Sequence, residues 1–176
     1  KFLDCLNKVK NTIKIPKCKF LNDGLYPIVS QESSLISGYW DNMNDLLNVE
    51  KPVIIFGDHT KAIKFIDFSF VRGADGIKVL LPIEQINSKF FYYLLRSVKL
   101  RDLGYARHYR LLKELVISYP TIEKQKKIVE SLDIIDNHIQ SLLASYEEEL
   151  KNLEELKKSI LQKAFSGELT NKNKAA

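Results

Sequence analysis

The clearest pattern in the chain is a row of apolar residues in its last third, which recur at steps of mostly three and four positions. This is the period of one face of an α-helix. Pro120 disfavours a helix that continues from upstream. Thr121 can cap a new helix, Glu123 complements its dipole in the first turn, and Gly167 can end it. The pattern predicts one helix over residues 121–165, about 67 Å long at the α-helical rise. Its apolar face consists of Ile128, Leu132, Ile135, Ile139, Leu142, Tyr146, Leu150, Leu153, Leu156 and Ile160.

A helix of this length cannot bury its apolar face within a small globular core. The face therefore needs a second helix of similar length, in a partner protein or in a second copy of the chain. One extra residue between Tyr146 and Leu150 is a stutter, which locally unwinds a coiled coil. From periodicity alone, a generic oligomerisation rod is the plain interpretation of this helix.

Residues 1–120 carry short apolar runs between polar segments, which predict a mixed α/β body with many strands. The runs 53–56 and 77–81 are typical of buried strands, and 63–68 alternates as a half-exposed strand does. We also predict a last strand over 115–119.

One helix is predicted inside this body, over residues 89–99, with Ser88 as its cap. The stretch 30–49 is polar and rich in Asn, and we expect a long irregular loop there. The expected fold class is therefore α+β, with a globular body over residues 1–120, a long helix over 121–170 and a tail over 171–176.

The charge of the chain is unevenly spread. Residues 121–176 carry nine Lys and ten acidic residues, which leaves 18 of the 27 basic and 12 of the 22 acidic residues in the body. The five arginines, Arg72, Arg96, Arg101, Arg107 and Arg110, all lie in that body. A basic body beside a near-neutral helix points to a polyanionic partner, and we expect double-stranded DNA.

Other function classes find little support in the composition. We find no Walker loop, G-x-G-x-x-G or H-E-x-x-H motif, and we expect neither a catalytic site nor a metal or cofactor in this chain. Cys5 and Cys18 are the only cysteines, too few for a four-ligand zinc site, and they fit a reducing cytosol. No run of 18 apolar residues is present, so no membrane span is expected. The chain starts at Lys1 rather than Met, and we expect that its native N-terminus is missing.

Three segments supply the candidate DNA contacts, because each places donors or cations in a turn. They are residues 57–64, 70–76 and 104–110. Arginine suits both phosphate and guanine edges, and tyrosine adds a stacking face. The candidate residues are His59, Lys61, Lys64, Arg72, Tyr105, Arg107, His108, Tyr109 and Arg110.

Each candidate has a structural alternative. A surface cation can pair with Asp58, Asp67, Asp75 or Asp102 instead of DNA. His59 next to Asp58 suggests a catalytic pair, but neighbouring residues usually point apart, and Asp58 is better interpreted as a residue that stabilises its loop.

Several motifs together resemble the specificity (S) subunit of type I restriction–modification systems. Residues 119–129, YPTIEKQKKIV, are similar to the P-x-x-E-Q-x-x-I motif at the start of that family's spacer helix, with Lys124 as an extra residue. Residues 156–170, LKKSILQKAFSGELT, resemble the end of that helix. In the body, GLYPIV, FGDHT and ADG are similar to parts of a target recognition domain, and they begin at Gly24, Phe56 and Ala74.

The resemblance implies a non-catalytic subunit whose body reads one half of a bipartite DNA target. It also implies that the helix packs antiparallel on a second one, here in a homodimer, and docks methyltransferase subunits, with restriction subunits as further candidate partners. S-adenosylmethionine, ATP and Mg²⁺ would then belong to partner subunits in a bacterial or archaeal cytoplasm. Two alternatives stay open: a coiled-coil adaptor with a basic body, and the recognition fragment of a fused methyltransferase–nuclease.

Overall fold

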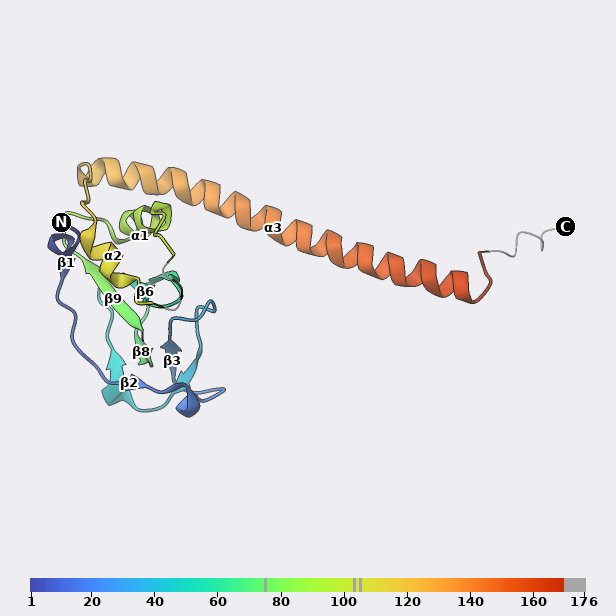
Figure 1. Ribbon diagram of the computed structural model, residues 1–176, viewed down its shortest axis with the longest axis horizontal. Helices are drawn as coiled ribbons and strands as arrows, with labels where there is room; N and C mark the ends of the chain where they lie inside the picture. The colour runs from blue at the N-terminus through green and yellow to red at the C-terminus, as the bar shows by residue number, and fades with distance from the viewer. Residues whose placement is uncertain (75, 103, 105, 170–176) are drawn as a thin grey trace. The chain divides into compact units, whose positions relative to one another are not determined.

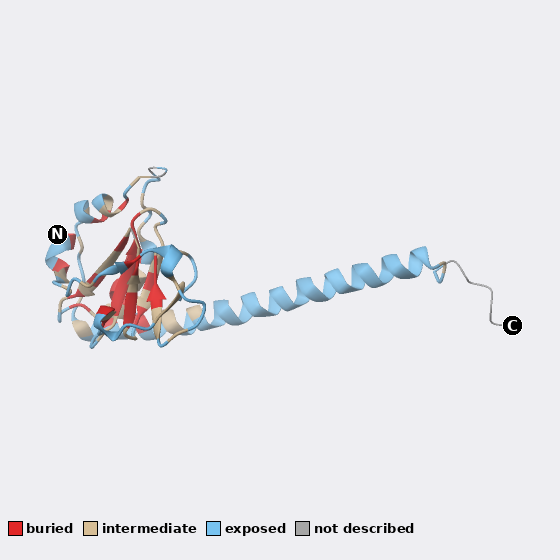
Figure 2. Ribbon diagram, turned by 90° about the horizontal axis from the view of Figure 1, so that it is seen from below, coloured by how far each residue is buried: buried red, intermediate tan, exposed pale blue. Residues whose placement is uncertain are grey.

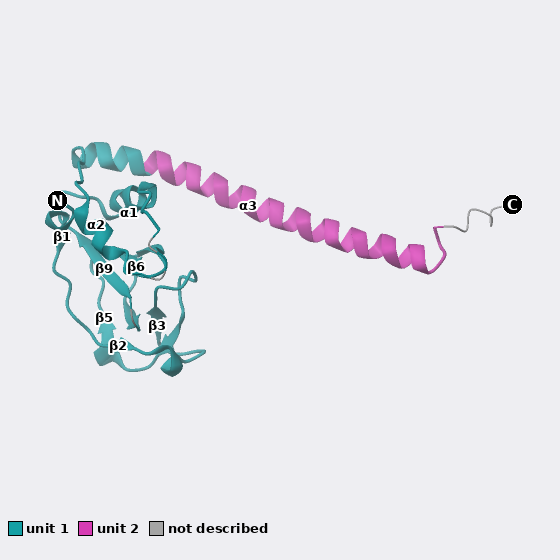
Figure 3. Ribbon diagram, viewed as in Figure 1, with its two compact units in different colours: residues 1–129 teal, residues 130–176 magenta. Residues whose placement is uncertain are grey.

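The computed structural model describes residues 1–74, 76–102, 104 and 106–169. It divides into two units, Lys1–Val129 and Glu130–Ala176 (Figure 3). The sequence placed the boundary at Pro120. The first unit also contains the first turns of the long helix, because Gln125 and Val129 on those turns are buried.

The first unit contains a four-stranded antiparallel sheet with the order β1-β9-β6-β7 (Figure 1). Its strands are β1 (Leu6–Asn7), β9 (Ile77–Pro82), β6 (Val53–Gly57) and β7 (Ile63–Ile66). The strands predicted at 53–56 and 77–81 are confirmed. The half-exposed strand at 63–68 is also confirmed, although it ends at Ile66.

A second sheet has the order β2-β8-β3-β4, and β5 also pairs with β8. Its strands are β2 (Lys14–Ile15), β8 (Phe70–Gly73), β3 (Tyr26–Val29), β4 (Gly38–Trp40) and β5 (Leu46–Leu47). The strand β8 runs parallel to β2 and β3 and antiparallel to β5. The prediction of an irregular loop over 30–49 is therefore wrong in part, because β4, β5 and the 3-10 helix η3 (Met43–Asp45) lie within it. These strands are too short to leave a period in the sequence.

Helix α1 (Ser88–Ser97) lies where a helix is predicted, but its cap is Asn87 rather than Ser88. The Asn87 side chain accepts from the backbone N–H groups of Lys89 and Phe90, at 2.9 and 3.0 Å. Ser88 instead donates to the carbonyl oxygen of Pro52.

The strand predicted over 115–119 is wrong. Leu115 is extended, but residues 115–119 belong to neither sheet. The backbone N–H of Phe2 donates to the oxygen of Leu115 at 3.0 Å. The segment follows a short helix that the sequence did not predict, α2 (Tyr109–Glu114). Two further 3-10 turns, η1 (Phe2–Cys5) and η2 (Lys17–Lys19), lie near the N-terminus.

Strand β6 is buried on both faces, and this explains its uninterrupted apolar run. Ile54 and Phe56 pack in a cluster with residues of α1 and α2, including Phe91 and Leu112. The alternating residues Val53 and Ile55 face the opposite way, into a cluster shared with β3, β7 and β8. Figure 2 shows these buried strands inside the first unit.

Helix α3 (Ile122–Phe165) confirms the predicted long helix and its stop. Gly167 has a φ of 78°, and its backbone N–H donates to the oxygen of Ala164. The N–H of Glu168 donates back to the oxygen of Lys163 at 3.0 Å, which completes a Schellman-type end. Figure 2 shows that α3 is exposed beyond its first turns. Among the described residues, no helix is long and apolar enough to cross a membrane.

Candidate nucleic-acid interface

A basic groove of about 260 Å³ brings together residues from four separate parts of the first unit. Lys14 of β2 lies beside Arg72 of β8, with which it pairs in the sheet, and Lys78 belongs to β9. Among the described residues that line the groove, none is acidic. They are Val9, Lys10, Asn11, Lys14, Arg72, Ile77, Lys78, Val79 and Tyr109. Of the four cations, Lys78 forms an ion pair with the buried Asp58, and the other three create a local positive potential that suits a polyanion.

Arg72 is the most constrained cation of this groove. Its Nη1 donates to Oδ1 of Asn11 at 2.8 Å and lies 3.5 Å from the oxygen of Thr12. Its Nε is buried without a hydrogen-bond partner, and burial lowers the pKa of the guanidinium. Among the described residues, no carboxylate lies within ion-pair distance of Arg72. An anion that enters the groove would therefore meet a guanidinium that Asn11 orients and that no carboxylate neutralises.

A buried carboxylate holds the other side of the groove together. Oδ1 of Asp58 accepts from the backbone N–H of Tyr109 at 2.8 Å, and its Oδ2 lies 3.8 Å from Nζ of Lys78. The backbone oxygen of Asp58 accepts from the N–H of His108 at 2.8 Å. Lys78 also lies 5.4 Å from the ring centre of Tyr109. Asp58 therefore joins the loop after β6 to the start of α2, which confirms its loop-stabilising role.

The segment 104–110 is divided between a loop and a helix. Arg107 ends the loop and is exposed, whereas Tyr109 and Arg110 begin α2. Tyr109 is half-buried, and burial together with the Asp58 charge raises its pKa. Arg107 and Arg110 are exposed and form no ion pair with any described residue. Both side chains are therefore accessible to a ligand in solvent. Tyr105 lies outside the described residues.

Two of the predicted DNA contacts are buried side chains. Lys64 is 6% exposed, and its Nζ donates to the backbone oxygens of Ser30 at 2.8 Å and Ser34 at 2.5 Å. Burial lowers the pKa of its ammonium. His108 is fully buried, with Nδ1 3.1 Å from the oxygen of Asp58. Both side chains hold the fold rather than face solvent.

The remaining candidates lie in the loop after β6. Lys61 has a φ of 59° and forms an ion pair with Asp102 at 3.0 Å, which is the alternative considered for it. This ion pair is the main reason that the pKa of Asp102 is lowered. His59 is half-buried, and its backbone N–H donates to Oε1 of Gln31. The structure does not bring these two side chains into the lining of the basic groove.

Sequence reasoning missed three cations of the groove: Lys10, Lys14 and Lys78. A signal for the first two was present, because residues 5–19 contain five lysines and no acidic residue. Lys78 had no such signal, since it is one polar position in the alternating strand β9.

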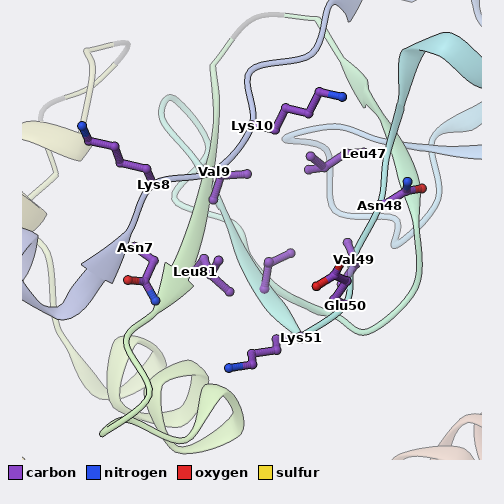
Figure 4. Close-up of a pocket in the computed structure, with 11 residues that line it drawn as sticks. Asn7, Lys8, Val9, Lys10, Leu47, Asn48, Val49, Glu50, Lys51 and Leu81 are labelled. Atoms are coloured by element: carbon purple, nitrogen blue, oxygen red, sulfur yellow. The ribbon is translucent and has the colours of Figure 1, made fainter.

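A second groove of about 490 Å³ adjoins the first at Val9 and Lys10 (Figure 4). Figure 4 shows Lys8 and Lys10 extending away from each other on either side of Val9. Its lining is mixed in charge, because it includes Glu50 and a Lys51 that pairs with Glu84 at 2.9 Å. The acid-free groove is the better site for a polyanion. Among the described residues, no group of three or more potential ligands could hold a metal ion.

The apolar face of α3 is a second candidate surface. Its residues are exposed, for example Leu150 at 63% and Tyr146 at 59%. Most of their positions are symmetric about residue 144: Ile128 and Ile160 both lie 16 residues from it, Leu132 and Leu156 12 residues, and Leu142 and Tyr146 two residues, whereas Ile139 and Leu150 lie five and six residues from it. An antiparallel second copy would therefore meet apolar side chains along most of the face.

Comparison with known proteins gives one family. A family model described as a type I restriction modification DNA specificity domain matches residues 3–152. A comparison with curated proteins gave no match.

Two solved structures share the fold at 16% sequence identity. One comes from work on complex assembly and conformational transition of the type I R-M system, with a TM-score of 0.67 over 90% of this chain and 43% of that chain. The other is the crystal structure of the HsdS subunit from Thermoanaerobacter tengcongensis, with a TM-score of 0.56 over 95% of this chain and 44% of that chain. The chain thus spans less than half the length of either structure. Because the family model covers both the two-sheet body and much of α3, the chain belongs to the type I restriction modification DNA specificity domain family.

Proposed function

We propose that this chain is a DNA sequence-specificity component of a type I restriction–modification system, and that its first unit reads one half of a bipartite target. The observation that carries the proposal is a groove lined by four cations and no acidic residue, with three of the cations outside any ion pair with a described residue, in a chain that belongs to a DNA specificity family. A double helix presents a line of phosphates that such a groove can follow.

The cations divide by how firmly they are held. Lys10 and Lys14 are exposed lysines, and they suit phosphates, which need charge rather than a fixed orientation. Arg72 is fixed by Asn11, and a fixed guanidinium suits a bidentate contact with a guanine edge or a phosphate. Arg107, exposed in the loop before α2, is a further candidate for a phosphate contact. Phosphate contacts would supply most of the affinity, and a few base contacts the sequence.

Helix α3 supplies the second part of the proposal. Its exposed, largely symmetric apolar face supports antiparallel pairing with a second copy, and the pair would dock methyltransferase subunits. Methylation, ATP-driven steps and their cofactors would then belong to partner subunits. This chain would recognise the target sequence and set the distance between the two half-sites.

Two measurements test the proposal. The chain should be retained on duplex DNA in a salt-dependent way, with log K falling by about 0.9 for each phosphate contact per decade of salt. Assembled with its methyltransferase subunits, it should direct methylation to adenines within two inverted half-sites separated by unread bases. A chain that is not retained on duplex DNA would favour an adaptor that binds an acidic protein surface. Methylation within one continuous recognition sequence would contradict the proposal that two recognition bodies read two separated half-sites.

A further inference from the structure

The start of α3 is attached to the first unit by one buried polar side chain. Gln125 is 0% exposed, although it lies on the second turn of a helix with exposed neighbours on both sides. Its Nε2 donates to the backbone oxygens of Gln85 at 2.9 Å and Pro120 at 2.8 Å. Its Oε1 accepts from the backbone N–H of Asn87 at 2.8 Å. Both amide protons and the amide oxygen are therefore used.

These contacts define the orientation of the amide. A flipped Gln125 would place its oxygen against two carbonyl oxygens and its NH₂ against the N–H of Asn87, so only one orientation satisfies all three partners. The partners are backbone atoms of the segment between β9 and α1, together with the residue that precedes α3. Asn87 is also the cap of α1, so the amide joins the starts of two helices.

A polar attachment of this kind differs from apolar packing in what it specifies. Val129, one turn later, contributes apolar contact to the core cluster. Apolar contact is non-directional and tolerates sliding and rotation. Two of the three hydrogen bonds reach backbone atoms of the segment between β9 and α1, and they tolerate neither, because a rotation of the helix start against that segment leaves a buried donor or acceptor unpaired.

We propose that Gln125 is a positioning residue that fixes the direction in which α3 leaves the recognition body, and thereby the distance at which two half-sites are read. The second clause rests on the proposed function, whereas the first concerns the fold alone. Gln125 touches no DNA in this proposal and acts only through the helix.

A distance measurement tests the first clause without DNA. Spin labels are placed on the exposed Cys18 and on a Glu148→Cys variant, since Cys5 is buried, and labelled chain is diluted with unlabelled Cys18→Ser chain. The parent should show one narrow label-to-label distance by pulsed electron paramagnetic resonance. Gln125→Met and Gln125→Glu, which keep the size but remove both donors, should lose this single distance and give a broad distribution. The exposed neighbour supplies a matched control, and Lys124→Ala should keep the narrow distance.

Val129→Ala separates orientation from stability. It should lower the melting temperature, because it removes core packing, yet keep the single distance. If Val129→Ala broadens the distribution as much as the Gln125 variants do, packing at large sets the direction and the inference is wrong. A narrow, unchanged distance in both Gln125 variants would equally overturn it.

Methylation of duplexes with altered spacing tests the second clause. With its methyltransferase subunits, the parent should modify its two half-sites at one spacing only. The Gln125 variants should also modify duplexes one base pair shorter or longer, with unchanged half-site sequences. Variants that keep the parental spacing would refute the link between Gln125 and distance. A parent that modifies no bipartite target would instead refute the proposed function and leave the distance measurement to decide the role of Gln125.

Discussion

Arg72 and Lys64 are both cations on strands of the first unit, and their surroundings differ. The ammonium of Lys64 donates hydrogen bonds to two backbone oxygens in the interior, so it stabilises the fold. Arg72 keeps a buried Nε without a partner and lines an acid-free groove. At the scale of single residues, the chemistry of the partner atoms therefore makes Lys64 a structural cation and Arg72 the one that we propose as a DNA contact.

If the proposed function holds, Arg72→Ala should weaken the binding of the chain to duplex DNA. We expect a loss of about 1–3 kcal/mol if the guanidinium reads a base edge, with relaxed specificity at one position. If it contacts a phosphate instead, all sequences should weaken alike and the salt slope should fall by about one unit. Filter binding across a salt series measures both, with the exposed Lys99→Ala as a charge-matched control. Unchanged affinity in Arg72→Ala would remove the groove from the interface.

Lys64→Met should behave in the opposite manner. It leaves the oxygens of Ser30 and Ser34 without their donor, and we expect the free energy of unfolding to fall by about 1–3 kcal/mol. Because the ammonium is buried, the salt slope of DNA binding should stay the same. Denaturant unfolding and the same filter assay check the two parts. A lower salt slope with unchanged stability would return Lys64 to the DNA contacts.

At the scale of elements, the question is whether two copies of α3 pair antiparallel or parallel. The apolar face of α3 would match a second copy in either direction. Residues 128 and 160 are 32 positions apart, or about 48 Å along the helix, so they cannot be joined within one chain. In a Cys18→Ser background, the double variant Ile128→Cys with Ile160→Cys should form disulfide-linked dimers if the copies are antiparallel. Each single variant should then stay unlinked.

Oxidised samples on a non-reducing gel distinguish the two arrangements. Cross-linking by either single variant would show parallel pairing and contradict the proposed dimer. Cys5 does not confuse the result, because it is buried in the core cluster of the first unit.

At the scale of the whole molecule, the proposal that α3 sets the distance between two half-sites predicts what happens when the helix is lengthened. Seven residues inserted after Ala144, the centre of the symmetric positions, keep the apolar face in phase, so dimerisation should survive. The two recognition bodies should separate by about 10 Å, or about three base pairs of B-DNA. Mapping of methylated adenines should show loss of the original target, and any new target should keep the half-sites at a wider spacing. An insertion variant that still modifies the original target would mean that α3 does not set the distance.

Local patterns were enough to predict some of these features. The period of α3 and its Gly167 end are local properties, because a helix satisfies its own backbone and its stop needs only one left-handed residue. The apolar run of β6 was equally informative, since a strand covered on both faces must be apolar throughout. The motifs around Gln125 also pointed to the family that the later comparison supports.

Other features exist only through tertiary pairing. The strands β2 and β5 have two residues each and no period of their own, and the segment 115–119 has a strand-like sequence but belongs to neither sheet. A strand forms only with a neighbouring strand that completes its hydrogen bonds, and a local sequence pattern does not predict which strand that is.

The candidate site depends on tertiary structure for the same reason. By itself, the sequence determined that the body is basic, that its arginines are confined there and that a long helix follows. It could not determine that Lys14, Arg72 and Lys78 would share one groove with Tyr109, because only sheet pairing and the Asp58 contacts bring these distant positions together. Nor could it show that Lys64 would be buried, since one alternating strand offers two faces and the packing of the second sheet decides which of them meets solvent.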